Sequence, residues 1–218
     1  MSVVAGPSPA AGCRAGPRAE LSFGPLVVRY DDSVIEPRPW TIAQSEWAAE
    51  AALGVPAGPI LELCCGAGHI GLATAVLTGR PLVQVDASAA ACDLARDNAR
   101  RTGLAPVVAV RRRQLLDAAA SHERFPVILA DPPYIPSGEV GSFDDPEHAI
   151  DGGADGLDLA AACCVVAADH LVAGGVFSLQ LGGRDQWERL ARRLPLPLRF
   201  VEHRSYGADR SVVHLTLE

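Results

Sequence analysis

The chain has 218 residues, of which 49% are apolar, so it is long enough for one α/β domain with a full core and short for two. Its formal net charge is −7, and all 19 basic residues are arginine. The absence of lysine excludes Schiff-base catalysis and a Walker P-loop, and the acidic balance argues against strong sequence-independent binding to nucleic acid.

No apolar run approaches the roughly 18 residues of a membrane span, so we expect a soluble, cytoplasmic protein with no membrane partner. The six cysteines occur as two adjacent pairs and two single residues, and none of the spacings is typical of a zinc site. We therefore expect reduced thiols and no bound metal.

The N-terminal part of the chain precedes the main pattern of strands and helices. Residues 1–20 are rich in Gly, Pro and Ala, lack the apolar segment of a secretory signal, and predict a disordered leader. Residues 21–55 predict one or two strands, a proline-containing loop, and a helix over 41–53. We expect this segment to pack on one larger domain over 56–218.

Strands and helices alternate from residue 58 onward. Strands are predicted at 58–65, 81–88, 106–113, 125–131 and 176–182, and helices at 69–79, 88–103, 156–175 and 184–194. The tail, 198–218, predicts two strands around a short turn with no helix between them. The fold class is therefore α/β, a Rossmann-like doubly wound, mostly parallel sheet with a C-terminal antiparallel hairpin. In such sheets, ligands bind beyond the carboxyl ends of the strands.

Glycines follow the first of these strands. Gly66, Gly68 and Gly71 match the pattern G-x-G-x-x-G between a strand and a helix, which lets the backbone approach a ligand closely. The match alone is weak, because a tight turn explains it equally well. Two acids strengthen it: Glu62 inside the strand can accept from a ligand's ammonium, and Asp86 at the tip of the next strand can accept from both ribose hydroxyls.

Gln114 and Leu115 follow the third strand, where they can reach an adenine ring. The amide would accept from the exocyclic amino group, and the leucine would cover one face of the ring. A nucleoside site of this kind suits either NAD or S-adenosylmethionine. The C-terminal hairpin, the acid within the first strand and the group at the end of the fourth strand favour the methyl donor.

The fourth strand ends in Asp131, Pro132, Pro133 and Tyr134. The prolines stiffen this loop and leave carbonyls pointing outward. The segments "VIEPRPWT", "LELCCGAGHIGL", "VQVDAS", "LADPPYIPS" and "AIDGGADGLDL" together make the chain resemble class I S-adenosylmethionine-dependent methyltransferases. More narrowly, about residues 26 to 217 are similar to the protein (glutamine-N5) methyltransferases that modify peptide-chain release factors.

The resemblance implies an N-methyltransferase with S-adenosyl-L-methionine as cofactor, and it also implies which residues act. The Asp131 side chain and the Pro132 carbonyl accept from the N–H groups of the substrate nitrogen, so that its lone pair faces the methyl group. Tyr134 stacks on the planar substrate, and Pro133 completes the substrate site. The implied cofactor-binding residues are Glu62, Cys64, Cys65, Gly66, Ala67, Gly68, Asp86, Gln114, Leu115 and Asp131.

Three residues depart from the family pattern. Asp131 stands where the glutamine methyltransferases usually have Asn, and an ionised carboxylate only accepts, which suits an adenine or guanine amine, a guanidinium or an alkylamine. Trp40 stands in place of an acid and is either a stacking wall for a flat substrate or a core residue. Cys64 replaces the usual first glycine, which is tolerable if its φ is negative.

Our first hypothesis is a cytoplasmic N-methyltransferase that acts on an amide or other planar amine nitrogen. Its partner would be a protein substrate, a release factor, with a small partner protein of the kind that archaeal and eukaryotic relatives use. The alternative is a methyltransferase for a nucleic-acid base or a small-molecule amine, which fits Asp131. A third hypothesis is a binding module that keeps the cofactor fold without turnover, which Cys64 and the missing acid at Gln114 support.

Overall fold

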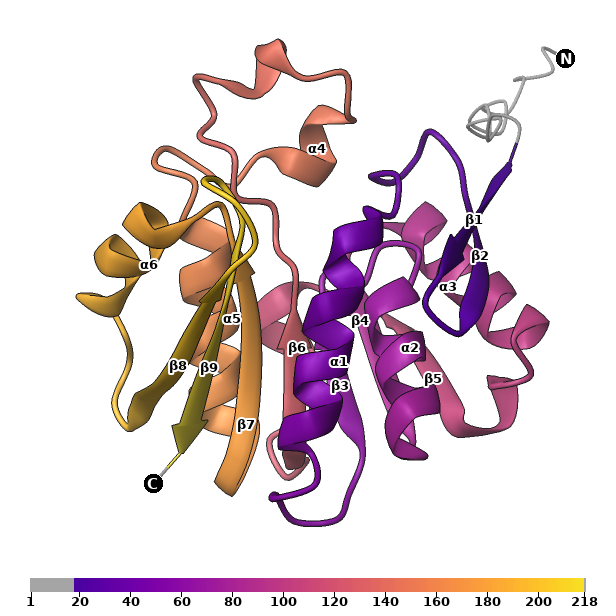
Figure 1. Ribbon diagram of the computed structural model, residues 1–218, viewed down its shortest axis with the longest axis horizontal. Helices are drawn as coiled ribbons and strands as arrows, with labels where there is room; N and C mark the ends of the chain where they lie inside the picture. Colours follow the sequence, from indigo (N-terminus) through magenta and orange to yellow (C-terminus); the bar gives the residue numbers. More distant parts are fainter. Residues whose placement is uncertain (1–17, 218) are drawn as a thin grey trace, which may run out of the picture.

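The computed structural model describes residues 18–217, so the first 17 residues of the predicted leader lie outside the described part. Within this range seven strands form one sheet in the order β5-β4-β3-β6-β7-β9-β8 (Figure 1). The strands β3 to β7 run parallel, and β9 runs antiparallel to both β7 and β8. The strands are β3 (Ile60–Leu63), β4 (Leu82–Asp86), β5 (Val108–Arg112), β6 (Phe125–Ala130), β7 (Leu171–Leu181), β8 (Leu198–Ser205) and β9 (Ser211–Leu217). The predicted fold class is confirmed.

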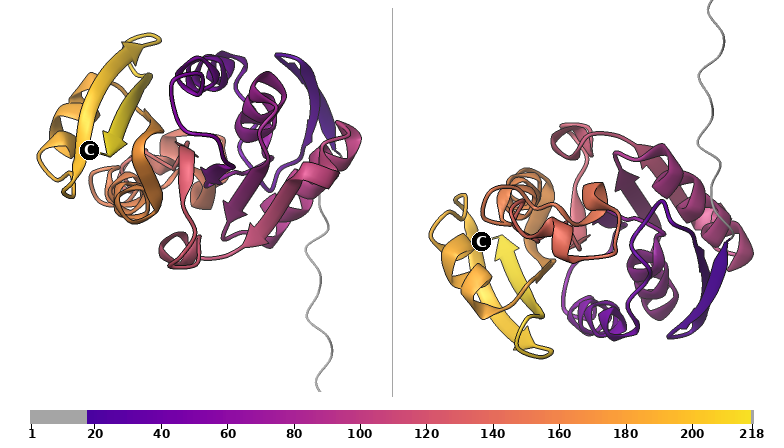
Figure 2. Two further views of the ribbon diagram at one scale, coloured as in Figure 1. Left: turned by 90° about the horizontal axis from the view of Figure 1, so that it is seen from below. Right: turned by 90° about the horizontal axis from the view of Figure 1, so that it is seen from above.

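Helices cover both faces of this sheet (Figure 2). Successive side chains of a strand point to opposite faces, so Ile60 joins the core beneath α1 and α2, while Leu61 joins the core beneath α5. Because both faces are covered, β3 and β6 are buried along their whole lengths. The helices are α1 (Ile42–Ala51), α2 (His69–Thr78), α3 (Ala89–Arg101), α4 (Glu147–Ile150), α5 (Asp158–His170) and α6 (Arg184–Ala191). None of the helices within residues 18–217 has the length and apolar content to cross a bilayer.

The N-terminal segment forms a separate hairpin of β1 (Ala19–Phe23) and β2 (Leu26–Tyr30). The amide of Asn98, on α3, accepts from the backbone N–H of Arg29 at 2.7 Å and donates to the carbonyls of Arg29 and Ala67 at 2.8 and 2.9 Å. This buried side chain therefore joins the hairpin to the glycine-containing loop after β3.

The end of α5 differs from the sequence prediction. A helix over 156–175 was expected to end at the glycine pair, but α5 ends at His170 and β7 begins at the next residue. The His170 ring lies 3.0 Å from the Glu123 carbonyl, and Leu171 pairs with Phe125 at the start of β6. Contacts with a strand far away in the sequence therefore end the helix. The apolar sequence of residues 156–175 does not reveal these contacts.

Candidate active site

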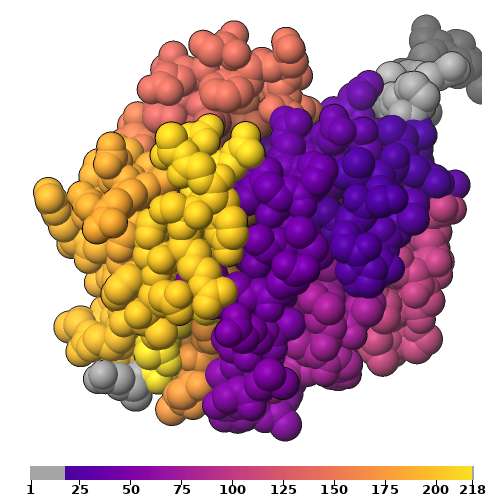
Figure 3. All heavy atoms as spheres, viewed as in Figure 1, coloured from indigo at the N-terminus to yellow at the C-terminus, as the bar shows by residue number. Residues whose placement is uncertain are grey.

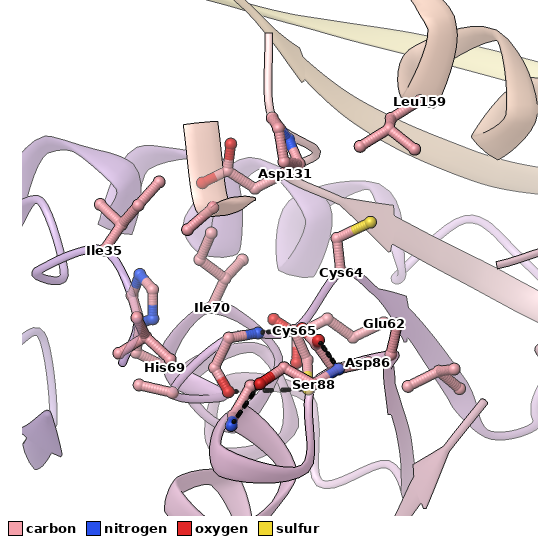
Figure 4. Close-up of a pocket in the computed structure, with 18 of the residues that line it drawn as sticks. Ile35, Glu62, Cys64, Cys65, His69, Ile70, Asp86, Ser88, Asp131 and Leu159 are labelled. Carbon is pink, nitrogen blue, oxygen red and sulfur yellow. Dashed lines mark hydrogen bonds between the residues drawn. The ribbon is translucent and has the colours of Figure 1, made fainter. Parts of the chain in front are cut away.

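A cavity of about 530 Å³ opens at the carboxyl ends of the parallel strands. This volume is within the range of small-molecule binding sites. The predicted site residues that line it are Glu62, Cys64, Cys65, Gly66, Ala67, Asp86, Gln114, Leu115, Asp131 and Pro133. Figure 4 shows several of them around one hollow, with the Asp131 carboxyl pointing toward the side of Ile35 and the loop that carries Cys64 and Cys65 below it. Three predicted residues are not on its wall: Gly68, Pro132 and Tyr134.

Asp86 is held in place by the backbone on both sides. Its Oδ2 accepts from the Gly66 N–H at 2.9 Å and its Oδ1 accepts from the Ser88 N–H at 2.8 Å. Ser88, not Asp86, caps α3, because its side chain accepts from the Ala91 N–H. Each Asp86 oxygen keeps a lone pair for a hydroxyl donor, so this carboxylate fits the ribose of a nucleoside.

The three glycines of the pattern have different tasks. Gly66 lies on the cavity wall with φ at +52°, and a Cβ there would meet no atom within 4 Å. A Cβ at Gly68 would meet the Gln84 amide, and one at Gly71 would meet the Glu62 carboxyl. Only Gly66 therefore leaves room for a ligand, and the other two make room for packed side chains.

Glu62 holds the glycine-containing loop after β3 in place through hydrogen bonds. It is 3% exposed and accepts from the Gly71 N–H at 2.8 Å and from Gln84 Nε2 at 2.6 Å. Gln84 Nε2 also donates to the Gly68 carbonyl at 2.9 Å. Burial raises the pKa of Glu62 to about 7, partly offset by the hydrogen bonds from Gln84 and Gly71. The prediction that Glu62 contacts a ligand stays a prediction. The sequence did not indicate that Glu62 positions the loop.

The condition under which Cys64 would replace the glycine without strain, a negative φ, is not met. Its φ is +54°, the left-handed region, and it is the one non-glycine residue with positive φ among the described residues. This conformation costs an ordinary residue roughly 1–2 kcal/mol. The Cys64 side chain lines the cavity and packs against the core beneath α5, where the Cys163 thiol is its hydrogen-bond partner.

Asp131 follows β6 directly and faces the cavity (Figure 4). Burial raises the pKa of its carboxyl to about 7. No residue in the described part donates a hydrogen bond to that carboxyl. The strand tip itself is fixed by Gln44 of α1, which donates from Nε2 to the Ala130 and Ser178 carbonyls at 3.1 Å each.

Tyr134 is anchored by residues that sequence reasoning missed. Gln186 Nε2 donates to the Tyr134 carbonyl at 2.7 Å and Gln186 Oε1 accepts from the Gly182 N–H at 2.8 Å. A Cβ at Gly182 would lie 2.9 Å from the Tyr134 ring, so the ring packs against glycine backbone. Burial raises the Tyr134 pKa to about 12, and the charge of Asp131 adds to it.

Two segments far apart in the sequence are joined to each other beside the cavity. Arg38 donates to both carboxylate oxygens of Asp145 at 2.8 Å, which ties the loop before α1 to the loop before α4. Figure 3 shows the region around α4 capping the molecule beside the turn between β8 and β9. Trp40 is not a core residue: its ring lies 6.0 Å from that of Tyr206, and the Arg210 guanidinium lies 5.4 Å from its centroid.

A parallel sheet extended by an antiparallel hairpin, with a glycine turn after β3 and acids at the tips of β4 and β6, defines the class I methyltransferase fold. The chain belongs to the methyltransferase small domain family, whose model matches residues 50–182. The matched family is one of methyltransferases, the class that the sequence predicts.

Individual proteins resemble the chain over most of its length. It is 32% identical over 163 residues to a release factor glutamine methyltransferase of Gloeobacter violaceus, covering 72% of this chain and 57% of that protein. It is 34% identical over 175 residues to the Mycobacterium tuberculosis protein of the same name, covering 73% and 55%. A 16S rRNA N2 methyltransferase of T. thermophilus, solved with AdoMet and guanosine, matches with a TM-score of 0.67 and 20% identity, covering 93% of this chain and 50% of that one. The chain spans about half the length of the curated relatives it matches.

Proposed function

We propose that this chain transfers the methyl group of S-adenosylmethionine to an amide or other planar amine nitrogen, with a glutamine side chain of a release factor as the first candidate acceptor. The observation that carries the proposal is the Asp131 carboxyl. It has no hydrogen-bond donor among the described residues and faces the cavity that also holds Asp86. An acceptor group kept free at this place suits a substrate that brings its own N–H groups.

The cofactor would be held mainly by the loop after β3 and by the tips of β4 and β5. Asp86 accepts from the ribose hydroxyls, and Gly66 leaves space for the nucleoside. Gln114 and Leu115, on the same wall, contact the adenine. When bound, the cofactor supplies an electrophilic methyl group, and the chain's own residues orient the nitrogen that receives it.

Asp131 and the Pro132 carbonyl would then hold the acceptor nitrogen. Tyr134, which lies off the wall of the cofactor cavity, would stack on the planar group of the acceptor rather than on the cofactor. Gln44 and Gln186 fix the backbone on either side of this loop, so its acceptors stay in place before the substrate arrives.

Asp131 is compatible with a glutamine acceptor. With a pKa of about 7, its carboxyl is protonated in part of the molecules near neutral pH, and a protonated carboxyl offers one donor and one acceptor, as Asn does. Ionised Asp131 only accepts, which supports the second candidate, an amine of a nucleobase or small molecule. A cytoplasmic location and a small partner protein belong to the same proposal.

Methyl transfer from labelled cofactor tests the proposal. Wild-type protein would be incubated in turn with release factor, oligonucleotides and small amines, alongside Asp131→Ala and the control Asp93→Ala. Asp93 lies on α3 with its side chain 71% exposed and paired only with Arg96. We expect labelled release factor with wild type and with the control, and loss with Asp131→Ala. Label in none of the acceptors would contradict the proposal, and label only in oligonucleotides or amines would select the second candidate.

A further inference from the structure

A buried amide, that of Gln180, comes from the strand next to Asp131. In the parallel pairing of β6 with β7, Ala130 lies opposite Leu179, and both side chains belong to the core beneath α5. The residues that follow them, Asp131 and Gln180, therefore turn to the opposite face of the sheet, which α1 covers. Both side chains thus lie at the carboxyl ends of adjacent strands, on the same face.

The other residues of β7 place Gln180 on the α1 side as well. Val176, four residues earlier, packs in the core beneath α1 and α2. Ser178 lies opposite His214 of β9, and the His214 ring stacks on Trp47 of α1 with the ring centroids 3.4 Å apart. Gln180 continues this row toward the end of the strand, because every second side chain of a strand points to one face.

The Tyr134 ring packs next along the same row. Gly182 follows Gln180 by two residues, and a Cβ on Gly182 would lie 2.9 Å from the Tyr134 ring. Gln180 therefore has Asp131 on the neighbouring strand and the Tyr134 ring just beyond it. These are the two side chains that would hold and stack on the acceptor, so the Gln180 amide belongs to the surroundings of the acceptor's planar group.

The carboxamide of Gln180 makes no hydrogen bond with any of the described residues. The residue is 2% exposed, and its Oε1 is buried without a partner. Three other buried glutamines, Gln44, Gln84 and Gln186, each donate from Nε2 to a backbone carbonyl. Buried polar groups are normally hydrogen-bonded, so a free buried amide beside the acceptor site indicates a group that arrives with the substrate.

An amide acceptor needs a donor that ionised Asp131 does not supply. A carboxamide carries two N–H donors and one carbonyl acceptor. In the proposed binding mode, the Asp131 carboxylate and the Pro132 carbonyl both accept, so they engage the two N–H groups and leave the carbonyl of the acceptor unpaired. The side chain of Gln180 can donate an N–H to that carbonyl.

We propose that Gln180 binds the carbonyl oxygen of an amide acceptor through its side-chain N–H, and that this contact selects an amide over an amine. The inference rests on the proposed function and deepens it, because it assigns a residue to the group that distinguishes the two candidate acceptors. An alkylamine has no carbonyl to pair with Gln180, so the enzyme would bind it without this hydrogen bond.

Methylation of release factor by Gln180→Met and Ser178→Ala tests this contact. Methionine has nearly the same size as glutamine and donates no hydrogen bond. Ser178 is the matched control, since it is buried on the same face two residues away and its Oγ is also without a partner. We expect Gln180→Met to lower kcat/KM for release factor at least about tenfold, and Ser178→Ala to behave as wild type. All three proteins should bind S-adenosylhomocysteine equally.

A second substitution separates a contact with the acceptor from a role in packing. Asp131→Asn introduces a donor beside an acceptor, so it can serve the carbonyl that Gln180→Met leaves unpaired. The double variant Asp131→Asn/Gln180→Met should therefore recover part of the activity that Gln180→Met loses. If Gln180 only fills space in the core, the second substitution recovers nothing, and the inference is wrong.

NMR of wild-type protein labelled with ¹⁵N-glutamine gives a readout that needs no variant. The side-chain N–H signals of Gln180 should shift when release factor is added to the complex with S-adenosylhomocysteine. Unchanged Gln180 signals, or equal methylation by wild type and Gln180→Met, would overturn the inference and leave the proposed function standing. Failure of wild type to label any acceptor would instead contradict the proposed function, and the inference with it.

Discussion

Replacing Asp131 by Asn should stabilise the ligand-free protein at alkaline pH. The pKa of its carboxyl is raised from 3.8 to about 7, and at 1.36 kcal/mol per pKa unit this is about 4 kcal/mol of folding free energy as an upper limit. Water in the open cavity screens the charge, so we expect a gain of roughly 2 kcal/mol. Asn has nearly the same shape and carries no charge, and no hydrogen bond within the described residues is lost with the carboxylate.

The sign follows from the protonation states. Below about pH 4 the carboxyl is neutral in both the folded and the unfolded chain, so it contributes no difference. Between about pH 4 and pH 7 the folded state binds the extra proton, so wild-type stability falls as pH rises through this window. Above about pH 7 both states are ionised and the full penalty of the buried charge is present.

Urea unfolding at several pH values between 4 and 9 measures this difference, with Asp93→Asn as the matched exposed control. The gain in free energy of unfolding from Asp131→Asn should be largest at pH 8 and above and vanish toward pH 4. A gain that is absent at pH 8, or equal at all pH values, would refute the idea of an unbalanced buried carboxyl.

Three further outcomes are expected. Cys64→Gly should be more stable than Cys64→Ala by about 1 kcal/mol in urea unfolding, because both lose the thiol and only glycine accepts the positive φ without strain. Asp86→Ala should weaken binding of S-adenosylhomocysteine at least about tenfold by calorimetry, or about 1.4 kcal/mol, while Asp93→Ala leaves it unchanged. Tyr134→Phe should keep most methyl-transfer activity, whereas Tyr134→Ala should raise KM for the acceptor, because the ring face rather than the hydroxyl contacts the acceptor. Equal effects of the two substitutions would contradict stacking.

Much of the site could be predicted from the sequence because parallel strands bring their ends together. Asp86 and Asp131 each follow an apolar run, so the alternation of strands and helices was enough to place both at one edge. The same reasoning found the glycine turn at Gly66. These positions depend on local pattern and topology, which periodicity reveals.

What could not be predicted depends on register and on backbone angles. Glu62 lies opposite Gln84 in the pairing of β3 with β4, and only that register shows why Gly68 and Gly71 must lack side chains. The positive φ of Cys64 conflicts with its residue type, so no propensity indicates it.

The two glutamines that fix the loop after β6 were missed for a related reason. Gln44 on α1 and Gln186 on α6 are buried, and their amides bind carbonyls far away in the sequence. A glutamine within a helical pattern normally indicates a solvated face. Only the tertiary contact itself separates a solvated glutamine from a buried one that binds a distant carbonyl. The substrate loop is therefore positioned by residues that carry no motif.

Tandem mass spectrometry of release factor after incubation with wild-type protein and a cofactor carrying a deuterated methyl group tests the central claim most directly. The expected result is the deuterated methyl on one glutamine side chain, absent with Asp131→Ala and present with Asp93→Ala. The claim of methyl transfer to a planar nitrogen at Asp131 would be contradicted if the protein binds S-adenosylhomocysteine and yet labels neither release factor, nor nucleic acid, nor small amines.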